Sequence, residues 1–335
     1  MHHGSIVKRI LLIVAITGAT TGSMKAQEFL PGTGPLGPGG RDYAHYRFED
    51  APGSNGSPAV TDHRLDAGVV ISSTTRESCL LYQRFGHFGL NGDSQIPNGG
   101  PIIPRSLWSE DLGIRYFRQM DRGRVWGVNA SVGSDSDRLF NSMHETSVLG
   151  MVDLKIPSRQ RNAWLLSLSY SNNRYFANGV PLPGVAYQFQ SASGRFRGLI
   201  GFPFAALFWT PAPGWDARAS AFGPRRWSLD IGKLTTWHVR LHGGFEWGGQ
   251  TWLRAGRTDI RQTLNFERKR LYAGFESRLW HGLILDVSGG RQFDQYFYET
   301  ATFSGTGPKA SLPAGWYGAS SIAWRFGEKP SPHTI

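Results

Sequence analysis

Two short groupings of residues could support hydrolytic chemistry. Ser142 precedes His144 and Glu145, and nucleophilic hydrolysis needs a serine held by a histidine that a carboxylate orients. His238 and His242 form the second grouping. Neither grouping has the Gly-x-Ser-x-Gly turn or another spacing that is specific for a hydrolase. We therefore predict no catalytic residue, and a hydrolase is retained as an alternative function.

Metal and cofactor sites are also not indicated. The segment from Asp135 to Asp137 could offer carboxylate oxygens to calcium, but the glycine and distal glutamate of a calcium loop do not follow it. The glycine pairs at 243–244 and 289–290 do not open a helix, so they are not phosphate cradles. Cys79 is the single cysteine, which excludes an intramolecular disulfide. We predict neither a metal nor a cofactor.

Five charged residues are the candidate functional side chains, because each falls on the polar face of an alternating segment. They are Arg115, Arg270, Glu276, Arg278 and Asp286. If these segments are strands of a transmembrane β-barrel, the five side chains project into the lumen. Paired lumen charges usually form structural networks, and selective transport by these residues is the alternative interpretation.

The elements that must position these side chains are segments in which apolar and polar residues alternate. Between 126 and 133, Trp, Val and Ala alternate with Gly, Asn and Ser, and between 270 and 279 apolar residues alternate with Arg, Glu and other polar residues. The segments have about the ten residues that cross a bilayer at a tilt, whereas strands of a soluble sandwich are typically about half as long. The pattern predicts an all-β fold, a transmembrane antiparallel up-and-down β-barrel.

Counting the alternating segments predicts about twelve strands. They begin near residues 79, 107, 130, 148, 164, 195, 227, 237, 251, 268, 283 and 317. Further strand-like segments at 43–49 and 65–73 would give fourteen, and ten is the lower alternative. The prolines between 201 and 224 make that region the weakest part of the count, because proline cannot donate to a strand ladder.

The links between these segments are unequal in length, as expected for short periplasmic turns and longer extracellular loops. Short links are predicted at 121–123, 157–161, 248–250 and 281–282. Longer links are predicted at 89–106, 173–194 and 294–315.

The N-terminus has the regions of a secretory signal peptide. Lys8 and Arg9 precede the apolar run 10–16, and small residues lead to a predicted cleavage after Ala26. An exported chain of this kind is expected in the bacterial outer membrane.

The remaining chain divides by composition. Residues 1–26 are the signal peptide, and 27–58 are expected to form a Gly/Pro-rich flexible arm, because proline removes donors and glycine raises backbone entropy. The barrel is predicted over 59–326, and 327–335 would be a C-terminal tail.

Composition agrees with a barrel and excludes a bundle of membrane helices. Hydrophobic residues make up 40% of the chain, and the mean hydropathy is -0.32. Beyond the N-terminus, no stretch approaches the roughly 18 apolar residues of a spanning helix. The net charge of +11 is spread over many short segments rather than clustered, so nucleic-acid binding is not predicted. The expected contacts are outer-membrane lipid and the phosphates of lipopolysaccharide.

The last predicted strand ends on alternating large residues. Ile322, Trp324 and Phe326 resemble the C-terminal signal that the outer-membrane barrel assembly machinery recognises. The chain continues for residues 327–335 beyond Phe326, whereas the aromatic residue of that signal is usually the last one. We expect these three residues to act as the assembly signal and that machinery to be a partner.

Three local patterns carry a resemblance to a known family. They are Gly201-Phe202-Pro203-Phe204 with the proline-punctuated stretch after it, the segment from Arg268 to Phe275, and the segment from Gly289 to Asp294. The chain resembles a family of bacterial outer-membrane β-barrel proteins of unknown function, over roughly the whole mature chain. The resemblance implies the fold and no catalytic residues. The predicted function is a monomeric outer-membrane barrel with passive passage of small solutes or a general envelope role. The alternatives are an outer-membrane enzyme and a non-conducting structural or adhesive barrel.

Overall fold

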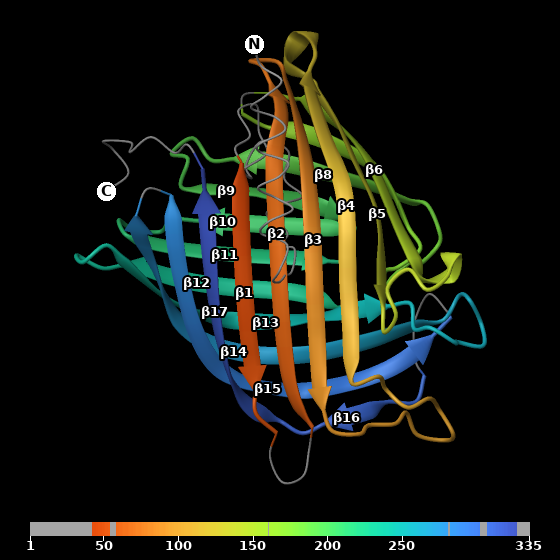
Figure 1. The fold of residues 1–335 in the computed structure, drawn as a ribbon. Helices are drawn as coiled ribbons and strands as arrows, with labels where there is room; N and C mark the ends of the chain where they lie inside the picture. Colours follow the sequence, from red (N-terminus) through yellow and green to blue (C-terminus); the bar gives the residue numbers. More distant parts are fainter. Residues whose placement is uncertain (1–41, 54–57, 160, 281, 302–306, 327–335) are drawn as a thin grey trace, which may run out of the picture.

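Seventeen strands form one antiparallel sheet in the computed structural model, and sixteen of them close into a barrel (Figure 1). The structure describes residues 42–53, 58–159, 161–280, 282–301 and 307–326. The ring closes because β1 pairs with β2 on one side and with β17 on the other. Within the described residues, β16 lies outside the ring and pairs with β15 alone.

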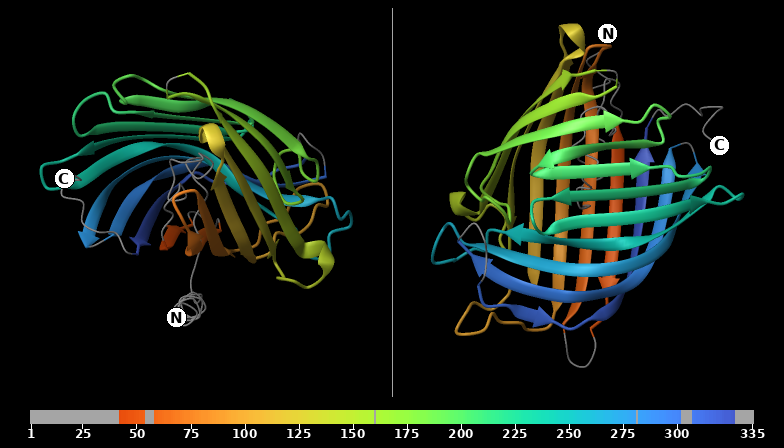
Figure 2. Two further views of the ribbon diagram at one scale, coloured as in Figure 1. Left: turned by 90° about the horizontal axis from the view of Figure 1, so that it is seen from above. Right: turned by 180° about the vertical axis from the view of Figure 1, so that it is seen from behind.

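The strands of the ring, which are all of those listed next except β16, follow one another in chain order, and each is antiparallel to its neighbours. They are β1 (Tyr43–Ala51), β2 (Ala59–Ser73), β3 (Glu77–Asn91), β4 (Ser106–Gln119), β5 (Val125–Ser136), β6 (Thr146–Pro157), β7 (Ala163–Ser171), β8 (Leu182–Gln190), β9 (Phe196–Phe202), β10 (Phe204–Trp209), β11 (Trp215–Phe222), β12 (Arg226–Leu234), β13 (Val239–Trp252), β14 (Thr263–Trp280), β15 (Leu283–Thr300), β16 (Ala310–Leu312) and β17 (Gly315–Arg325). Two short 3-10 helices, η2 (Asp121–Gly123) and η3 (Met143–Glu145), lie in connections. Figure 2 shows that β9 to β13 run steeply inclined to β1 to β4.

The predicted all-β antiparallel barrel is confirmed, but the predicted number of strands is wrong. The ring has sixteen strands, not about twelve, and neither fourteen nor ten. The candidates near 237 and 251 are a single strand, β13, which continues through the predicted link at 248–250. The twelve candidates also omit β1, β2, β8, β10 and β11.

The omitted strands have physical reasons for being missed. β8 lies inside the long link predicted at 173–194. β10 and β11 are short, and Pro203, Pro211 and Pro213 lie in the connections beside them, where the missing proline donor breaks no ladder. β1 falls in the predicted flexible arm, so residues 43–51 of that arm belong to the barrel wall. The predicted signal peptide and the C-terminal tail lie outside the described residues.

The connections differ between the two ends of the barrel. At one end, termed the short-turn end, the turns span 74–76, 120–124, 158–162, 191–195, 210–214, 235–238 and 281–282. At the other end, termed the mouth, the longer connections span 92–105, 137–145, 172–181, 253–262 and 301–314. Two connections at the mouth, 203 and 223–225, are also short. β1 begins and β17 ends at the short-turn end, so both ends of the barrel segment lie on one side.

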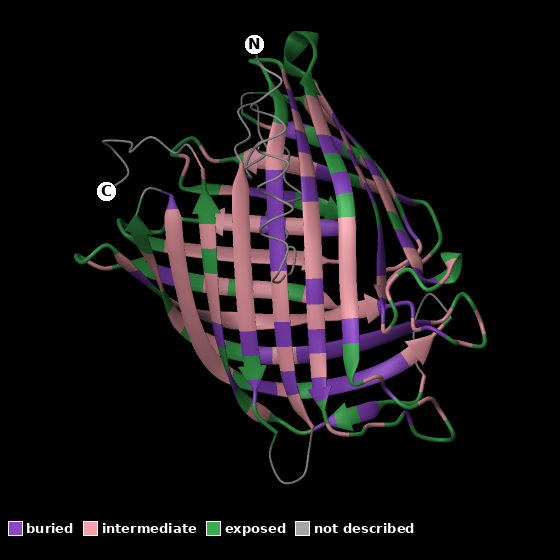
Figure 3. Cartoon of the chain, viewed as in Figure 1, coloured by how far each residue is buried: buried purple, intermediate pink, exposed green. Residues whose placement is uncertain are grey.

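The outer face of the strands is apolar and exposed, as a lipid environment requires. On β14, Leu271, Phe275 and Leu279 are exposed, whereas Arg270, Tyr272 and Glu276 line the interior. Figure 3 shows exposed and less exposed positions along the strands of the wall. The same exposure is found around the ring for Leu112, Ile114, Val132, Val152, Leu166, Leu168, Val185, Ile200, Leu229, Ile231, Leu241 and Ile322. Exposed aromatic residues on this face include Trp164, Tyr170, Trp209, Trp215 and Trp227. No helix in the described part of the chain is long and apolar enough to cross a membrane.

The largest apolar core lies inside the barrel at the mouth. β13 to β15 extend beyond β12, whose pairing with β13 begins at Trp247. A register shift between Glu267 and Lys269 interrupts the β14 to β15 ladder at the start of this extension. The inner face of the extension packs on β3, with the Phe88 ring 5.4 Å from that of Trp252 and 5.0 Å from that of Phe266. This core narrows the mouth.

Candidate functional site

The barrel encloses a cavity of about 700 Å³, which is the candidate functional site. Strands from most of the ring contribute inward side chains to its lining. β5, β6 and β7 contribute serines, among them Ser131, Ser147 and Ser167, whereas β12 to β15 contribute charged groups. The volume lies in the range of pockets that hold small molecules.

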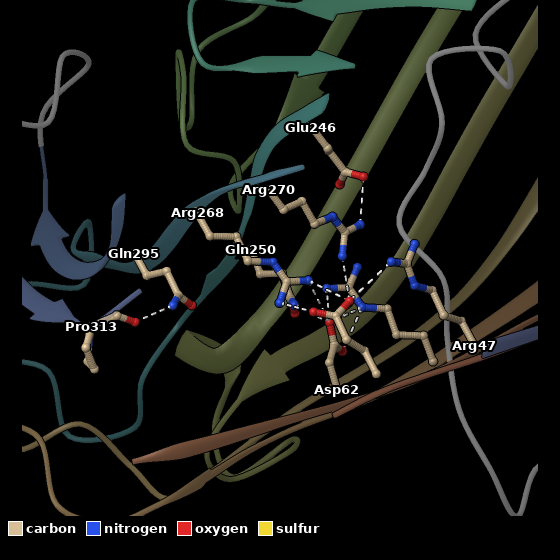
Figure 4. A network of polar contacts seen from close by, with 10 residues as sticks. Arg47, Asp62, Glu246, Gln250, Arg268, Arg270, Gln295 and Pro313 are labelled. Carbon is tan, nitrogen blue, oxygen red and sulfur yellow. Dashed lines mark hydrogen bonds and ion pairs between the residues drawn. The ribbon is translucent and has the colours of Figure 1, made fainter. Parts of the chain in front are cut away.

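Glu49 on β1 is the centre of a buried ion-pair network, termed the Glu49 bridge, which joins strands of the inner wall that are not neighbours. Figure 4 shows that Arg47, Arg268 and Arg270, the arginines of this network, extend toward one another. Its carboxylate accepts a hydrogen bond from Arg270 Nη1 at 2.6 Å and another from Arg268 Nη2 at 3.1 Å. Arg270 Nη2 in turn donates to Glu246 Oε2 at 2.6 Å. Arg47 Nη2 lies 3.2 Å from Glu49 Oε2. The side chains of Glu49 and Arg270 are almost fully buried, so each charge depends on the others for compensation.

Asp62 on β2, which pairs with Glu49 across the β1 to β2 ladder, extends the Glu49 bridge to β2 and β13. Its carboxylate binds Arg64 through two nitrogens, with Nη2 at 2.7 Å and Nε at 2.8 Å. Gln250 Nε2 on β13 donates to Asp62 Oδ2 at 2.9 Å. Arg268 Nη2 lies 3.7 Å from the same oxygen. Because β2 and β13 are not neighbours in the ring, these contacts fix the distance between two parts of the wall.

A second network, termed the Asp230 cluster, lies on β11 to β15. Arg240 binds Asp216 through two nitrogens, each 2.8 Å from a carboxylate oxygen, and also binds Asp230. His242 Nδ1 lies 3.1 Å from Asp230 Oδ2, and its Nε2 lies 3.0 Å from Asp286 Oδ2. The Tyr272 hydroxyl donates to Asp230 at 3.1 Å. The cluster therefore lines the cavity with groups that are already hydrogen bonded to one another.

The mouth is crossed by contacts between loops, termed the loop clasp. The backbone N–H of Leu253 donates to the carbonyl of Asp135 at 2.7 Å, and that of Ala255 donates to Asp137 Oδ1 at 2.6 Å. The side chain of Arg257 donates to the carbonyl of His144 and lies 3.7 Å from Glu145 Oε1. Burial lowers the pKa of the Arg257 guanidinium despite the neighbouring Glu145. The clasp joins the connection after β5 to the connection after β13.

The structure places the five predicted lumen charges in three different settings. Arg270, Glu276 and Asp286 line the cavity, and Arg270 and Asp286 belong to the two networks above. Arg115 is buried beside the Tyr82 ring, with its Cζ 5.2 Å from the ring centroid. Arg278 is exposed near the short-turn end of β14. A role of these residues in transport stays a prediction.

The groupings considered for hydrolysis and for calcium have structural roles. The Ser142 hydroxyl donates to Glu145 and accepts from the backbone N–H of His144, which caps η3. His238 lies in an exposed turn, whereas His242 lies in the Asp230 cluster, so the fold does not bring the two together. Asp135 and its neighbour Asp137 accept hydrogen bonds that hold the loops at the mouth. Among the described residues, no group of three or more His, Cys, Asp or Glu could hold a metal ion.

Sequence reasoning missed Glu49, Asp230 and Arg240, which carry the two networks. Asp230 and Arg240 lie on alternating strands, so their inward direction was available from the two-residue period. The partners of these side chains could not be obtained from that period, because pairing across non-neighbouring strands depends on the barrel geometry.

The predicted assembly residues lie at the short-turn end. Ile322 and Trp324 are exposed on the outer face of β17, and Phe326 follows that strand. The rings of Trp324 and Phe326 are 4.4 Å apart between centroids. Their role in assembly stays a prediction.

Comparisons with known proteins give structural likenesses only. No family model matches the chain, and no curated protein matches it in sequence, so the specific family suggested by the local patterns is not supported. An outer membrane channel from Pseudomonas putida F1 is 10% identical, with a TM-score of 0.34, covering 85% of this chain and 94% of that one. The TodX monoaromatic hydrocarbon channel, as a deltaS2 mutant, is 10% identical, with a TM-score of 0.36 and coverages of 92% and 96%. LpxR from Salmonella typhimurium is 8% identical, with a TM-score of 0.32 and coverages of 85% and 100%. These likenesses are too distant to carry an inference about function.

Proposed function

We propose that this protein is a passive outer-membrane channel for small solutes. The observation that carries the proposal is the cavity of about 700 Å³ inside a closed ring whose outer face is apolar. A barrel that only anchored itself in lipid would not need an interior of this size lined with serines and charged groups. A polar lumen of this kind lowers the free-energy cost of moving a hydrated solute across the hydrocarbon layer.

The Glu49 bridge, the loop clasp and the mouth core set the size of the solute. The Glu49 bridge and the loop clasp join parts of the wall that are not neighbours, and the apolar core occupies part of the mouth. A wide aqueous pore would leave no room for these contacts. The proposal is therefore a narrow channel of low conductance.

The proposed location is the bacterial outer membrane, reached through a signal peptide that is cleaved after Ala26. The same proposal includes the barrel assembly machinery as a partner that reads Ile322, Trp324 and Phe326, and lipopolysaccharide as a contact of the basic outer loops. Mass spectrometry of the protein purified from outer membranes tests the cleavage, with a mature chain beginning at Gln27 as the expected result.

Conductance measurement tests the channel. The refolded full chain is inserted into a planar lipid bilayer in KCl, and stepwise current increments of uniform small size are expected. Liposomes that contain the protein should swell in small sugars and not in large ones. Folded protein that inserts and gives neither current nor swelling would refute the proposal.

A second candidate function is a non-conducting structural barrel. The observation that favours it is the mouth core, in which Phe88, Trp252, Phe266 and Phe297 are each no more than about 1% exposed. If this core closes the lumen permanently, removing the loop clasp by substitution would not create a current. The conductance of clasp variants therefore separates the two functions.

A further inference from the structure

Charge is segregated around the lumen, and one side contains no acidic residue. Between 154 and 215 the chain has no Asp or Glu, while six residues are Lys or Arg. This stretch supplies β7, β8, β9 and β10, so four consecutive strands of the wall have no carboxylate. The carboxylates of the Glu49 bridge and the Asp230 cluster come from other strands.

Two of the arginines that line the cavity on or near this acid-free side form no ion pair with a described carboxylate and are close to an aromatic ring. They are Arg197 on β9 and Arg226 on β12, which is separated from β10 by β11. By contrast, Arg64, Arg268 and Arg270 are bound to Asp or Glu. Arg197 and Arg226 thus keep their charge available to a ligand.

Each of these arginines is held by an aromatic ring. Arg197 Cζ lies 4.4 Å from the centroid of Phe208, its partner across the β9 to β10 ladder. Arg226 Cζ lies 4.7 Å from the centroid of Tyr175, whose hydroxyl donates to the carbonyl of Phe222. A cation over a ring is oriented without being neutralised, because the ring carries no net charge.

The wall between the two arginines carries phenylalanines together with Arg218, which pairs with Asp216, and the hydrogen-bonded Ser220 and Ser228. Phe204, Phe208 and Phe222 line the cavity there, and Phe222 pairs both with Phe204 and with Arg226 across the β11 ladders. Cross-strand pairing places Asp230 on β12 level with Arg197 on β9. Arg226 lies four residues from Asp230 on β12, so Arg226 and Arg197 are roughly 13 Å apart along the strand direction. The wall therefore offers two cationic groups at the two ends of a surface that carries three phenylalanine rings.

We infer that this wall binds organic anions that have an apolar body, with Arg197 and Arg226 as the charge contacts and the phenylalanines as the apolar surface. The inference names the solute class of the proposed channel and rests on that function. An anionic group gains a charge-assisted hydrogen bond from either arginine, and its hydrocarbon part leaves water against the rings. Inorganic anions have no hydrocarbon part to bury against the rings, and organic cations are repelled by the arginines.

Binding measured by isothermal titration calorimetry on the full chain in detergent tests the inference, with benzoate and benzylammonium as probes of similar size and opposite charge. Benzoate is expected to bind at least roughly tenfold more tightly than benzylammonium, since one charge-assisted hydrogen bond is worth that factor or more. The double substitution Arg197→Gln and Arg226→Gln should lower the benzoate affinity roughly tenfold. Phe208→Ala should weaken benzoate and keep the preference for the anion.

The matched control removes the same charge outside the lumen. Arg159 and Arg195 are exposed and lie in turns at the short-turn end, so Arg159→Gln with Arg195→Gln should leave the benzoate affinity unchanged. Equal affinity for the two probes, or an unchanged affinity in the lumen double variant, would overturn the inference. The KCl current is recorded in a separate experiment. A current without a preference for benzoate would refute the proposed binding site alone. Arginine-dependent binding of benzoate without a current would refute the proposed channel function and leave the binding site standing.

Discussion

Neutralising Glu49 should destabilise the barrel more than neutralising an exposed carboxylate. Glu49 is 1% exposed, and its carboxylate receives contacts from Arg47, Arg268 and Arg270. Glu49→Gln keeps the shape of the side chain but leaves two buried guanidinium groups short of a negative charge. Removing one partner of a buried pair typically costs ~3–5 kcal/mol. Glu246 and Asp62 still contact these arginines, so we expect a value near the lower end, about 3 kcal/mol.

The assay is urea unfolding of protein refolded into lipid vesicles, followed by tryptophan fluorescence. Asp93→Asn is the matched control, because Asp93 pairs with Arg105 and both side chains are more than two-thirds exposed. Exposed pairs contribute little to stability because water already solvates both charges. If Glu49→Gln changed the free energy of unfolding no more than Asp93→Asn does, the Glu49 bridge would not be a stabilising element of the lumen wall.

Three further predictions test other parts of the structure. Phe275→Arg should cost ~2–4 kcal/mol in vesicles, because Phe275 faces lipid, and Glu276→Gln should cost much less, because Glu276 lines the cavity; equal costs would contradict the assignment of faces. Arg257→Ala should raise the single-channel conductance by weakening the loop clasp, and an unchanged current would argue that the clasp does not limit passage. Phe326→Ala should reduce membrane insertion measured by heat-dependent mobility on gels, while deletion of 327–335 should be tolerated; the reverse result would mean that the assembly signal is misplaced.

The fold class could be predicted from the sequence because side-chain alternation is a local property. β14 shows this well: the apolar Leu271 and Phe275 face outward and Arg270 and Glu276 face inward, as their spacing predicts. Alternation also specifies the direction of each side chain without any knowledge of the neighbouring strands.

The strand number could not be obtained in the same way, because some boundaries are set by contacts between distant strands. The glycines of β13 at 248–249 look like a turn, but the strand continues because β14 pairs with it as far as Trp252. β10 and β11 look like a proline-rich loop, yet each gains two ladder partners once the ring closes. Local propensity is overridden where the sheet supplies hydrogen bonds on both sides.

The candidate site follows the same division between local and non-local information. The absence of acidic residues between 154 and 215 is visible in the sequence, but it has meaning only when those residues are known to form four consecutive strands of one wall. Charge compensation in a barrel acts across the lumen and between strands two or more places apart, as Glu49 and Arg270 illustrate. Among the described residues, Arg197 on the acid-free side has no such partner within reach, and the cost of leaving it facing the cavity is lowest when the lumen holds water or an anion. The segregation of charge is therefore what a lumen that admits anions would require, and a solid, side-chain-filled barrel would have favoured carboxylates opposite Arg197 and Arg226.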